Sequence, residues 1–291
     1  MSAGSPTLTG NTRGILLMVG AMAVFALADV FIKLASVTMS PAHTTLLLLG
    51  GGGLVFAAIA RVEGHSLRNP HAFAPALLLR YLSEIMGSFG IVISLALVPL
   101  STVGAIIQAA PLTVTVGAVL FLGERVGWRQ WAAVCVGFAG VLLIVQPGAE
   151  GFSLAILWPV LAMLGLSGRD LTTRRIPADL PSTVLAAYTM LATMPPAILW
   201  CLIAEGQLFP DPIQWGYTAG MVTCGALAYL MLIAAIRGTE LSVVAPFRYS
   251  RLVFLMLLGT LVFGERPGPL VLLGAALIVV SGIYTMWRRG T

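Results

Sequence analysis

The sequence predicts an all-α integral membrane protein with ten transmembrane helices, arranged as two inverted five-helix repeats. Three observations predict this fold. The composition is strongly apolar, the apolar runs have the length of membrane-spanning helices, and the two halves of the chain repeat one another at a constant interval.

The composition excludes a soluble globular protein. Hydrophobic residues make up 58% of the 291 residues and charged residues 9%, and the mean hydropathy is +0.98. About a quarter of the residues are charged in soluble domains. The apolar runs lack the alternation of a membrane β-barrel, and they have the roughly 20 residues that a helix needs to cross the bilayer. The chain therefore belongs in a lipid bilayer as helices.

Ten apolar runs have this length, five in each half, separated by short polar or breaker-rich segments. We expect spans at 14–34, 42–60, 73–97, 101–122, 129–146, 153–172, 182–204, 215–235, 241–263 and 268–287. The first five-helix repeat then covers 14–146 and the second 153–287, joined by a linker at 147–152. The first span is too long for a signal-peptide core and lacks a cleavage site, so we expect it to remain.

The internal repeat has an offset of 141 residues over most of both halves, which indicates an ancient duplication. The matching positions are Asp29 and Asp170, Lys33 and Arg174, Leu100-Ser101 and Leu241-Ser242, Gly123-Glu124-Arg125 and Gly264-Glu265-Arg266, and Gly127 and Gly268. The function of a duplicated unit is expected between its two copies.

The distribution of Lys and Arg predicts the orientation, because cytoplasmic loops are enriched in these residues. With the N-terminal segment (1–13) in the cytoplasm, only Lys33 and Arg266 lie near the opposite surface. The cytoplasmic side collects Arg13, Arg61, Arg68, Arg125, Arg129, Arg169, Arg174, Arg175, Arg237, Arg288 and Arg289. Both termini, including the tail 288–291, are therefore expected inside. An odd number of spans per half inserts the second copy upside down, and the net charge of +5 is a topology signal rather than a nucleic-acid patch.

Inverted repeats provide a physical route to transport, because two similar bundles can exchange conformations around a central site. The ten spans and the Gly-Glu-Arg sequences that end the fourth span of each half resemble the drug/metabolite transporter superfamily, particularly its EamA-type members. The resemblance covers residues 14–287, and overall similarity is greatest to bacterial aromatic amino-acid exporters. It implies export of small metabolites, aromatic amino acids first, across the bacterial inner membrane by alternating access.

Charges near the span ends favour structural roles. Glu124 and Glu265 can stay hydrated or pair with a neighbouring Arg, and the glycines before them suit helix C-terminal turns. Asp29 and Lys33, like Asp170 and Arg174, are spaced i,i+4 on one helix face, which predicts pairing within each helix. Their duplication also fits a pair of matched gates.

Charges placed deeper are more informative, because an unpaired charge in the membrane costs several kcal/mol. Glu84 lies roughly 16 Å into its span, with Arg80 one turn away. In the ninth span Arg248 and Arg251 lie about 10 and 15 Å from the same side. These groups can pair with one another to gate or stabilise the bundle, or they can bind the two charges of a zwitterionic substrate.

Polar and aromatic residues at similar depth predict a cavity lining. The candidates are Tyr81, Gln108, Trp158, Tyr229 and Tyr249. With Glu84 and Arg251 they form the expected substrate site, whereas Asp29, Lys33, Arg80, Asp170, Arg174 and Arg248 are expected as gating or structural pairs. The prolines Pro111, Pro159, Pro195-Pro196 and Pro246 predict bends, since each removes an intrahelical hydrogen bond.

Catalysis finds little support. His43, His65 and His71 form no cluster with metal-ligand spacing, the three cysteines occupy separate spans, and no phosphate-binding loop is present. We expect no enzyme activity, metal or cofactor. The expected partners are a small-molecule substrate and the bilayer, with no nucleic acid and no obligate protein partner. Two alternatives stay open: export of other amino acids or drug-like metabolites, and a lipid flippase or membrane-embedded enzyme.

Overall fold

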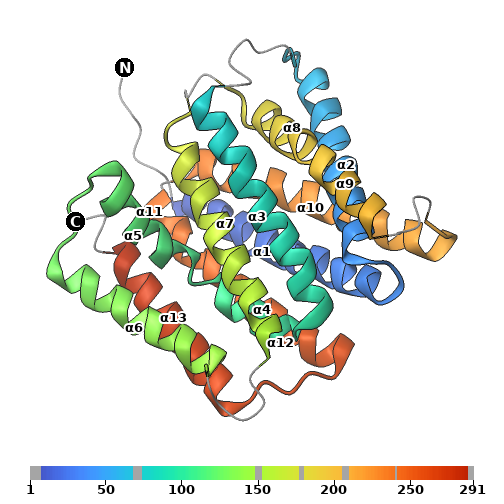
Figure 1. Cartoon of the computed structure of the whole chain (residues 1–291). Helices are drawn as coiled ribbons and strands as arrows, with labels where there is room; N and C mark the ends of the chain where they lie inside the picture. Colours follow the sequence, from blue (N-terminus) through green and yellow to red (C-terminus); the bar gives the residue numbers. More distant parts are fainter. Residues whose placement is uncertain are drawn as a thin grey trace, which may run out of the picture.

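Figure 1 shows the fold of the chain in a computed structural model. The structure describes residues 8–67, 74–147, 153–176, 180–204, 210–239 and 241–287. Every regular element in these residues is a helix. In chain order they are α1 (Leu8–Thr38), α2 (Pro41–Val62), α3 (Pro75–Leu97), α4 (Leu100–Ile107), α5 (Ala110–Leu122), α6 (Trp128–Val145), η1 (Leu154–Ile156), α7 (Leu157–Thr173), α8 (Ser182–Ala192), α9 (Met194–Ile203), α10 (Pro212–Gly238), α11 (Leu241–Val244), η2 (Ala245–Tyr249), α12 (Ser250–Phe263) and α13 (Pro269–Trp287).

These helices form ten spans long and apolar enough to cross a membrane, which confirms the predicted fold class. The observed span limits differ from the predicted ones by at most four residues. Large apolar side chains cover the outer surface, among them Leu16, Leu54, Leu120, Leu261 and Val280, each more than 60% exposed. An outer surface of this kind is stable only against lipid.

Local sequence determines where the helices begin and end. Ser40 caps α2, with Pro41 in the first turn, and Asp211 and Gln214 form a capping box at the start of α10. Gly123 and Gly264 end α5 and α12 in the left-handed region, with φ of 68° and 65°. This confirms the helix-terminating role predicted for the glycines of the two Gly-Glu-Arg sequences.

Three spans are interrupted near the predicted prolines. The fourth span breaks between α4 and α5 just before Pro111, and the seventh breaks at Thr193 before Pro195. The ninth span begins with the 3₁₀ turn η2, which contains Pro246. Pro159 instead falls in the first turn of α7, where a proline is tolerated, so it bends no continuous helix. The breaks in the fourth and ninth spans occupy matching positions of the two repeats.

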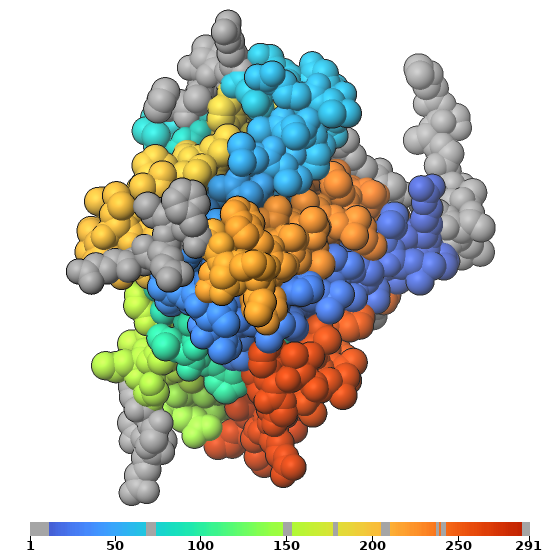
Figure 2. Space-filling model, turned by 90° about the vertical axis from the view of Figure 1, so that its right-hand side faces the viewer, coloured from blue at the N-terminus to red at the C-terminus, as the bar shows by residue number. Residues whose placement is uncertain are grey.

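The two halves pack against each other in a symmetric pattern (Figure 1). The first span of each half packs along the third span of the other half, as α1 with α10 and α7 with α3. The fifth spans pair with each other along one edge as α6 and α13, and the second spans pair at the other edge as α2 and α8. In Figure 2, α1 crosses the visible face between α10 and the C-terminal helices. The repeats are therefore interleaved.

Consecutive spans joined by short segments alternate in direction. We call the membrane side on which α1 begins side A, and the opposite side, on which α1 ends, side B. On this definition α4 begins and α12 ends on side B, whereas α5 and α7 end on side A. The contacts among these ends agree with that assignment, as described below.

Close approach of α3 and α7 depends on glycine. A Cβ on Gly165 would lie 2.3 Å from the backbone nitrogen of Gly87, and one on Gly90 would lie 2.9 Å from the backbone nitrogen of Ala162. The two backbones are therefore in direct contact, as small residues allow in membrane helix pairs. This crossing brings the charged residues of α3 and α7 together.

We predict that Gly165→Ala lowers the thermal unfolding midpoint of the purified protein, because α3 and α7 must separate to admit the methyl group. Overpacking of this kind costs about 1–3 kcal/mol. Gly225→Ala is the matched control, since a Cβ there meets nothing within 4 Å. An unchanged midpoint in Gly165→Ala would show that the crossing is not as tight as described.

Candidate functional site

A small cavity lies between the two repeats, beside the break in the fourth span. Its walls come from α1, α3 and α4 of the first repeat and α12 of the second. Asp29, Gln108 and Arg251 supply its polar groups, and the remaining lining is apolar apart from Gly104. The cavity has room for about one water molecule. The helices are therefore closed around this point in the structure.

Asp29 and Arg251 form an ion pair at this cavity. Arg251 donates from Nη2 to Oδ2 of Asp29 at 2.6 Å and from Nε at 3.2 Å, and its guanidinium lies 5.2 Å from the ring centre of Phe25. The Asp29 side chain is 9% exposed and that of Arg251 19%. The pair joins α1 to α12, so it connects the two repeats inside the membrane.

Gln108 contributes a second contact between the repeats. It forms the C-cap of α4, and its side-chain amide donates to the carbonyl of Arg248 at 3.2 Å. The carbonyl belongs to η2, whose last residue, Tyr249, is the register counterpart of Gln108. The breaks in the fourth and ninth spans therefore touch, and Gln108 places the break of the fourth span at the cavity. Irregular backbone at membrane depth is tolerated where it lines a cavity, and discontinuous helices often form substrate sites in transporters.

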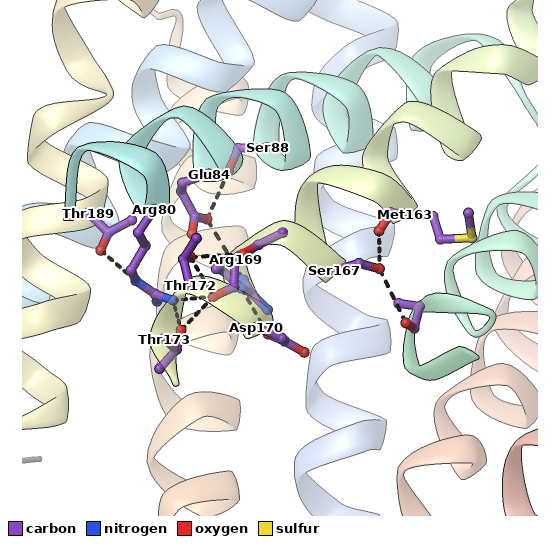
Figure 3. Close-up of polar contacts among 12 residues, drawn as sticks. Arg80, Glu84, Ser88, Met163, Ser167, Arg169, Asp170, Thr172, Thr173 and Thr189 are labelled. Carbon is purple, nitrogen blue, oxygen red and sulfur yellow. Dashed lines mark hydrogen bonds and ion pairs between the residues drawn. The ribbon is translucent and has the colours of Figure 1, made fainter. Parts of the chain in front are cut away.

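A second polar cluster lies between α3 and α7, nearer side A (Figure 3). Glu84 on α3 faces Arg169 on α7, with Oε1 and Nη1 3.8 Å apart, and also accepts from Ser88 at 3.1 Å. Arg169 lies 3.5 Å from Asp170 Oδ1 through its Nε. We call Arg80, Glu84, Arg169 and Asp170 the Arg169 cluster.

Arg80 is held differently from the other charged members of the Arg169 cluster. It is 8% exposed, and its guanidinium donates to the hydroxyl of Thr189 at 3.2 Å, to the carbonyl of Arg169 at 3.0 Å and to the hydroxyl of Thr173 (Figure 3). All three acceptors are neutral. Within the part of the chain that the structure describes, no carboxylate lies within ion-pair distance of Arg80.

On side B, Glu265 joins three elements. One carboxylate oxygen accepts from the backbone nitrogen of Leu100 at 2.6 Å, and the other accepts from the backbone nitrogen and hydroxyl of Ser101 at 2.9 and 2.8 Å. Lys33 lies 3.8 Å from the same carboxylate and also donates to the carbonyls of Leu95 and Val98. A carboxylate at a helix N-terminus is stabilised by free backbone N–H groups. Glu265 therefore ties α1 and the start of α4 to the end of α12.

On side A, the matching residues make the matching contact. Arg174 donates to Glu124 at 2.8 Å, and these residues are the register counterparts of Lys33 and Glu265. The two pairs differ in exposure: the side chains are 16% and 10% exposed for Lys33 and Glu265, but 40% each for Arg174 and Glu124. Side B is closed by a buried contact, whereas the contact on side A is exposed.

These contacts correct several pairings expected from spacing. Asp29 pairs with Arg251 rather than with Lys33 in its own helix, and Arg174 pairs with Glu124 rather than with Asp170. Glu84 pairs with Arg169, and Arg80 contacts neutral oxygens instead of forming a pair. The i,i+4 residues face different neighbouring helices, because pairing across the interface shields both charges from lipid better than pairing along one helix. Arg248 offers its carbonyl, and its side chain is exposed.

The aromatic candidates do not share one cavity. Tyr249 is 4% exposed, and its ring occupies the space that a Cβ on Gly282 would need. It packs against α13 instead of lining the cavity. Trp158 lies in the first turn of α7 and is 36% exposed, which fits an interfacial position. Both positions differ from the expected lining.

Tyr229 and Tyr81 lie nearer the Arg169 cluster. Tyr229 packs edge-to-face on Phe56 at 5.0 Å, its hydroxyl lies 3.5 Å from the carbonyl of Ser182, and it is within electrostatic range of Arg80 and Arg169. Tyr81 is half-buried beside Arg80 and Tyr188. Of the seven expected substrate residues, Gln108 and Arg251 line the central cavity, and Glu84, Tyr81 and Tyr229 lie at or near the Arg169 cluster.

Two important residues were missed by the sequence reasoning. Arg169 was counted only as a topology signal, and Glu265 only as a hydrated or paired span-end charge. The internal repeat could have predicted the role of Glu265. The offset of 141 residues relates Lys33 to Arg174 and Glu124 to Glu265, so the Lys33–Glu265 and Arg174–Glu124 pairs are equivalent under the repeat. Among the described residues, no group of three or more His, Cys, Asp or Glu side chains is placed to hold a metal ion.

The comparisons with known proteins agree with this architecture. The sequence profile of the EamA-like transporter family matches residues 12–146 and again residues 153–287. The chain belongs to the EamA-like transporter family. A solved crystal structure with 21% sequence identity superposes with a TM-score of 0.63, covering 94% of this chain and 97% of the other. That similarity concerns the fold.

Several bacterial relatives have transport names. A riboflavin transporter of Vibrio cholerae is 33% identical over 63% of this chain and 62% of its own length, and one of Rhizobium johnstonii is 33% identical over 72% and 69%. The pseudopaline exporter CntI of Pseudomonas aeruginosa is 26% identical over 93% of this chain and 94% of its own. The family and these relatives indicate a multi-pass transporter of the bacterial inner membrane rather than an enzyme. They do not support the narrower resemblance to aromatic amino-acid exporters.

We predict that Asp29→Asn destabilises the protein, because it leaves Arg251 charged and unpaired inside the membrane. Breaking a buried pair in this way costs about 3–5 kcal/mol. The double variant Asp29→Asn/Arg251→Gln is expected to recover part of the lost thermal stability. Asp170→Asn is the matched control, since that carboxylate is 39% exposed and 3.5 Å from its partner. Additive losses in the double variant would contradict the pairing.

Proposed function

We propose that the protein is a secondary transporter that moves a small, ring-containing metabolite through the central cavity by alternating access. The observation that carries this proposal is the cavity between the repeats, lined by Gln108 at the break of the fourth span and by the Asp29–Arg251 pair. An apolar wall with a few polar groups suits a small organic molecule. Gln108 and Arg251 are the proposed substrate contacts there.

The two ion pairs that are equivalent under the repeat are the proposed gates. Lys33 with Glu265 closes side B, and Arg174 with Glu124 forms the corresponding contact on side A. Inverted repeats make the outward-open and inward-open states similar in energy, because each repeat can adopt the conformation of the other. The buried pair on side B and the exposed pair on side A are the arrangement expected of a transporter that opens next toward side A.

We propose that side A is the cytoplasm, so that both termini lie inside. The support is the positive-inside distribution of Arg residues. Among the described residues on this side are Arg61, Arg125, Arg129, Arg174 and Arg175. The gate on side B then faces the periplasm.

Riboflavin is the first substrate to test. Two relatives named riboflavin transporters share 33% identity with this chain. Riboflavin has a flat three-ring system and a hydroxyl-bearing chain, without net charge at neutral pH. The closed cavity matches this chemistry, because its two charged groups neutralise each other and Gln108 offers a neutral polar group.

Export of aromatic amino acids is the second candidate. A zwitterion presents an ammonium and a carboxylate, and Asp29 with Arg251 presents the opposite signs side by side. Substrate binding would then replace the ion pair. The direction of net movement depends on the gradients. Relatives of this chain include the exporter CntI and an S-adenosylmethionine uptake transporter of Rickettsia bellii, which is 25% identical over 73% of this chain and 72% of its own length.

We predict that liposomes containing only this protein take up riboflavin faster than protein-free liposomes, followed by flavin fluorescence. Tryptophan is expected to move more slowly than riboflavin, and aspartate and lysine slowest, because an apolar cavity penalises a net charge. Efflux is measured in the same way, with the compounds loaded inside the liposomes instead of added to the external solution. Equal rates for all four compounds would contradict a selective cavity.

A second prediction concerns the gates. In a variant with Cys135, Cys201 and Cys224 replaced and Gln108→Cys introduced, a membrane-impermeant thiol reagent should label the cavity from side A more than from side B. Adding Glu265→Gln removes the charge that holds Lys33, and charge-assisted contacts are worth about 1.5–3 kcal/mol. Labelling from side B should therefore rise.

Glu124→Gln is the matched control for this experiment. It changes the counterpart pair, which is already exposed on side A, so labelling from side B should stay low. If both substitutions raised side-B labelling equally, Glu265 would not act as the gate on that side.

A further inference from the structure

The Arg169 cluster contains two arginines and two carboxylates, but both carboxylates approach Arg169 rather than Arg80. Glu84 and Asp170 both approach Arg169, at 3.8 and 3.5 Å, whereas Arg80 contacts only neutral oxygens. A charged side chain at membrane depth that makes no direct ion pair is costly, and such residues commonly mark substrate pathways. A role in binding an anion would explain why a charged Arg80 is present at this position.

The geometry leaves part of the Arg80 guanidinium available. Nε donates to Thr189, and Nη1 donates to Arg169 and Thr173. Within the described residues Nη2 has no hydrogen-bond partner, and it is not among the fully enclosed unpaired atoms. These neutral contacts hold the guanidinium plane in one orientation, while its second terminal nitrogen stays accessible.

The side chains around Arg80 are partly exposed and lie toward the side-A end of α3 and α7. Arg169 and Asp170 are 32% and 39% exposed at their side chains, and Arg80 lies five residues inside α3, about 8 Å from its start. Tyr81 follows Arg80 in α3, and Tyr229 of α10 is within electrostatic range of Arg80. Two guanidiniums beside phenol rings match an organic anion, since arginine binds carboxylates and phosphates through fixed N–H groups.

We propose that Arg80, assisted by Arg169, binds the oxyanion of a small organic molecule at the side-A entrance. The oxyanion is a carboxylate or a phosphate, and Tyr81 and Tyr229 contact the organic part. This inference goes beyond the proposed function. It concerns a subsite separate from the central cavity, and it holds for any substrate of that cavity.

Matched ligand pairs test the subsite on the full-length protein in detergent by direct binding. Flavin mononucleotide is compared with riboflavin for the phosphate, and N-acetylphenylalanine with its neutral amide for the carboxylate. We expect at least one anion to bind about tenfold or more tightly than its neutral counterpart, the range of a charge-assisted hydrogen bond. The pair that shows the preference identifies the oxyanion.

Arg80→Gln should abolish that preference while leaving the affinity for the neutral counterpart little changed. Arg80→Lys should retain part of it. Arg129→Gln is the control, because Arg129 is an exposed arginine on the same side that stacks on Trp128. Equal affinities within both pairs, or a preference that survives in Arg80→Gln, would overturn the proposal.

A second measurement retains both arginines in case Arg80→Gln fails to fold. Thr173→Cys, in the background without native cysteines, places a thiol beside the guanidinium. Relative to their rates with a free thiol, a negatively charged methanethiosulfonate should be favoured there over a positively charged one, and the preferred organic anion should slow the reaction. A relative rate that favours the positive reagent would contradict the subsite. Because neither test measures transport, both remain decisive if riboflavin is not transported.

Discussion

The cost of burying charge in a membrane is the constraint on which the rest of the structure depends. Four ion pairs join the first repeat to the second: Lys33 with Glu265, Asp29 with Arg251, Glu84 with Arg169, and Glu124 with Arg174. An isolated charge at the depth of Asp29, Arg251 or Glu84 would cost several kcal/mol, so each repeat stabilises buried charges of the other. The Glu124–Arg174 pair is instead 40% exposed at both side chains. Relative movement of the repeats must therefore break or exchange these contacts, which makes the bundle suited to a few discrete conformations.

The repeat gives these contacts their arrangement. Because the offset of 141 residues relates Lys33 to Arg174 and Glu265 to Glu124, one pair type occurs on both sides of the membrane. Its environments differ, since Glu265 also binds the N-terminus of α4 and its side chain is 10% exposed, whereas the side chain of Glu124 is 40% exposed. Two equivalent contacts in unequal states are the structural basis for the proposed alternation between sides.

The fold was predictable to a large extent, because apolar length and the internal repeat are strong signals. The ten spans, the left-handed glycines 123 and 264, and the breaks at Pro111, Pro195 and Pro246 agree with the sequence. The site was less predictable. Spacing along one helix indicates which residues share a face, but it does not say which neighbouring helix that face meets. Asp29 and Lys33 share a face and bind different partners, and Tyr249 turns toward α13 because Gly282 leaves room for its ring.

Glu84 and Arg251 were expected at the same depth, but they are not partners. Glu84 pairs with Arg169 and Arg251 pairs with Asp29, because the interleaved packing places these helices side by side. The glycine crossing of α3 and α7 could not be deduced from the sequence alone, since many glycines in the chain would permit such an approach. If it were known which spans of one repeat pack against which spans of the other, these ion pairs could have been predicted.

Reciprocal movement of the two sides is the central claim, and distances between spin labels test it most directly. Labels at Val37 and Arg266 report on side B, and labels at Arg125 and Ile176 report on side A. In membranes, addition of a transported substrate should lengthen one distance while the other shortens, so that the two openings are never wide together. Simultaneous widening on both sides, or fixed distances in a protein that transports, would contradict alternating access.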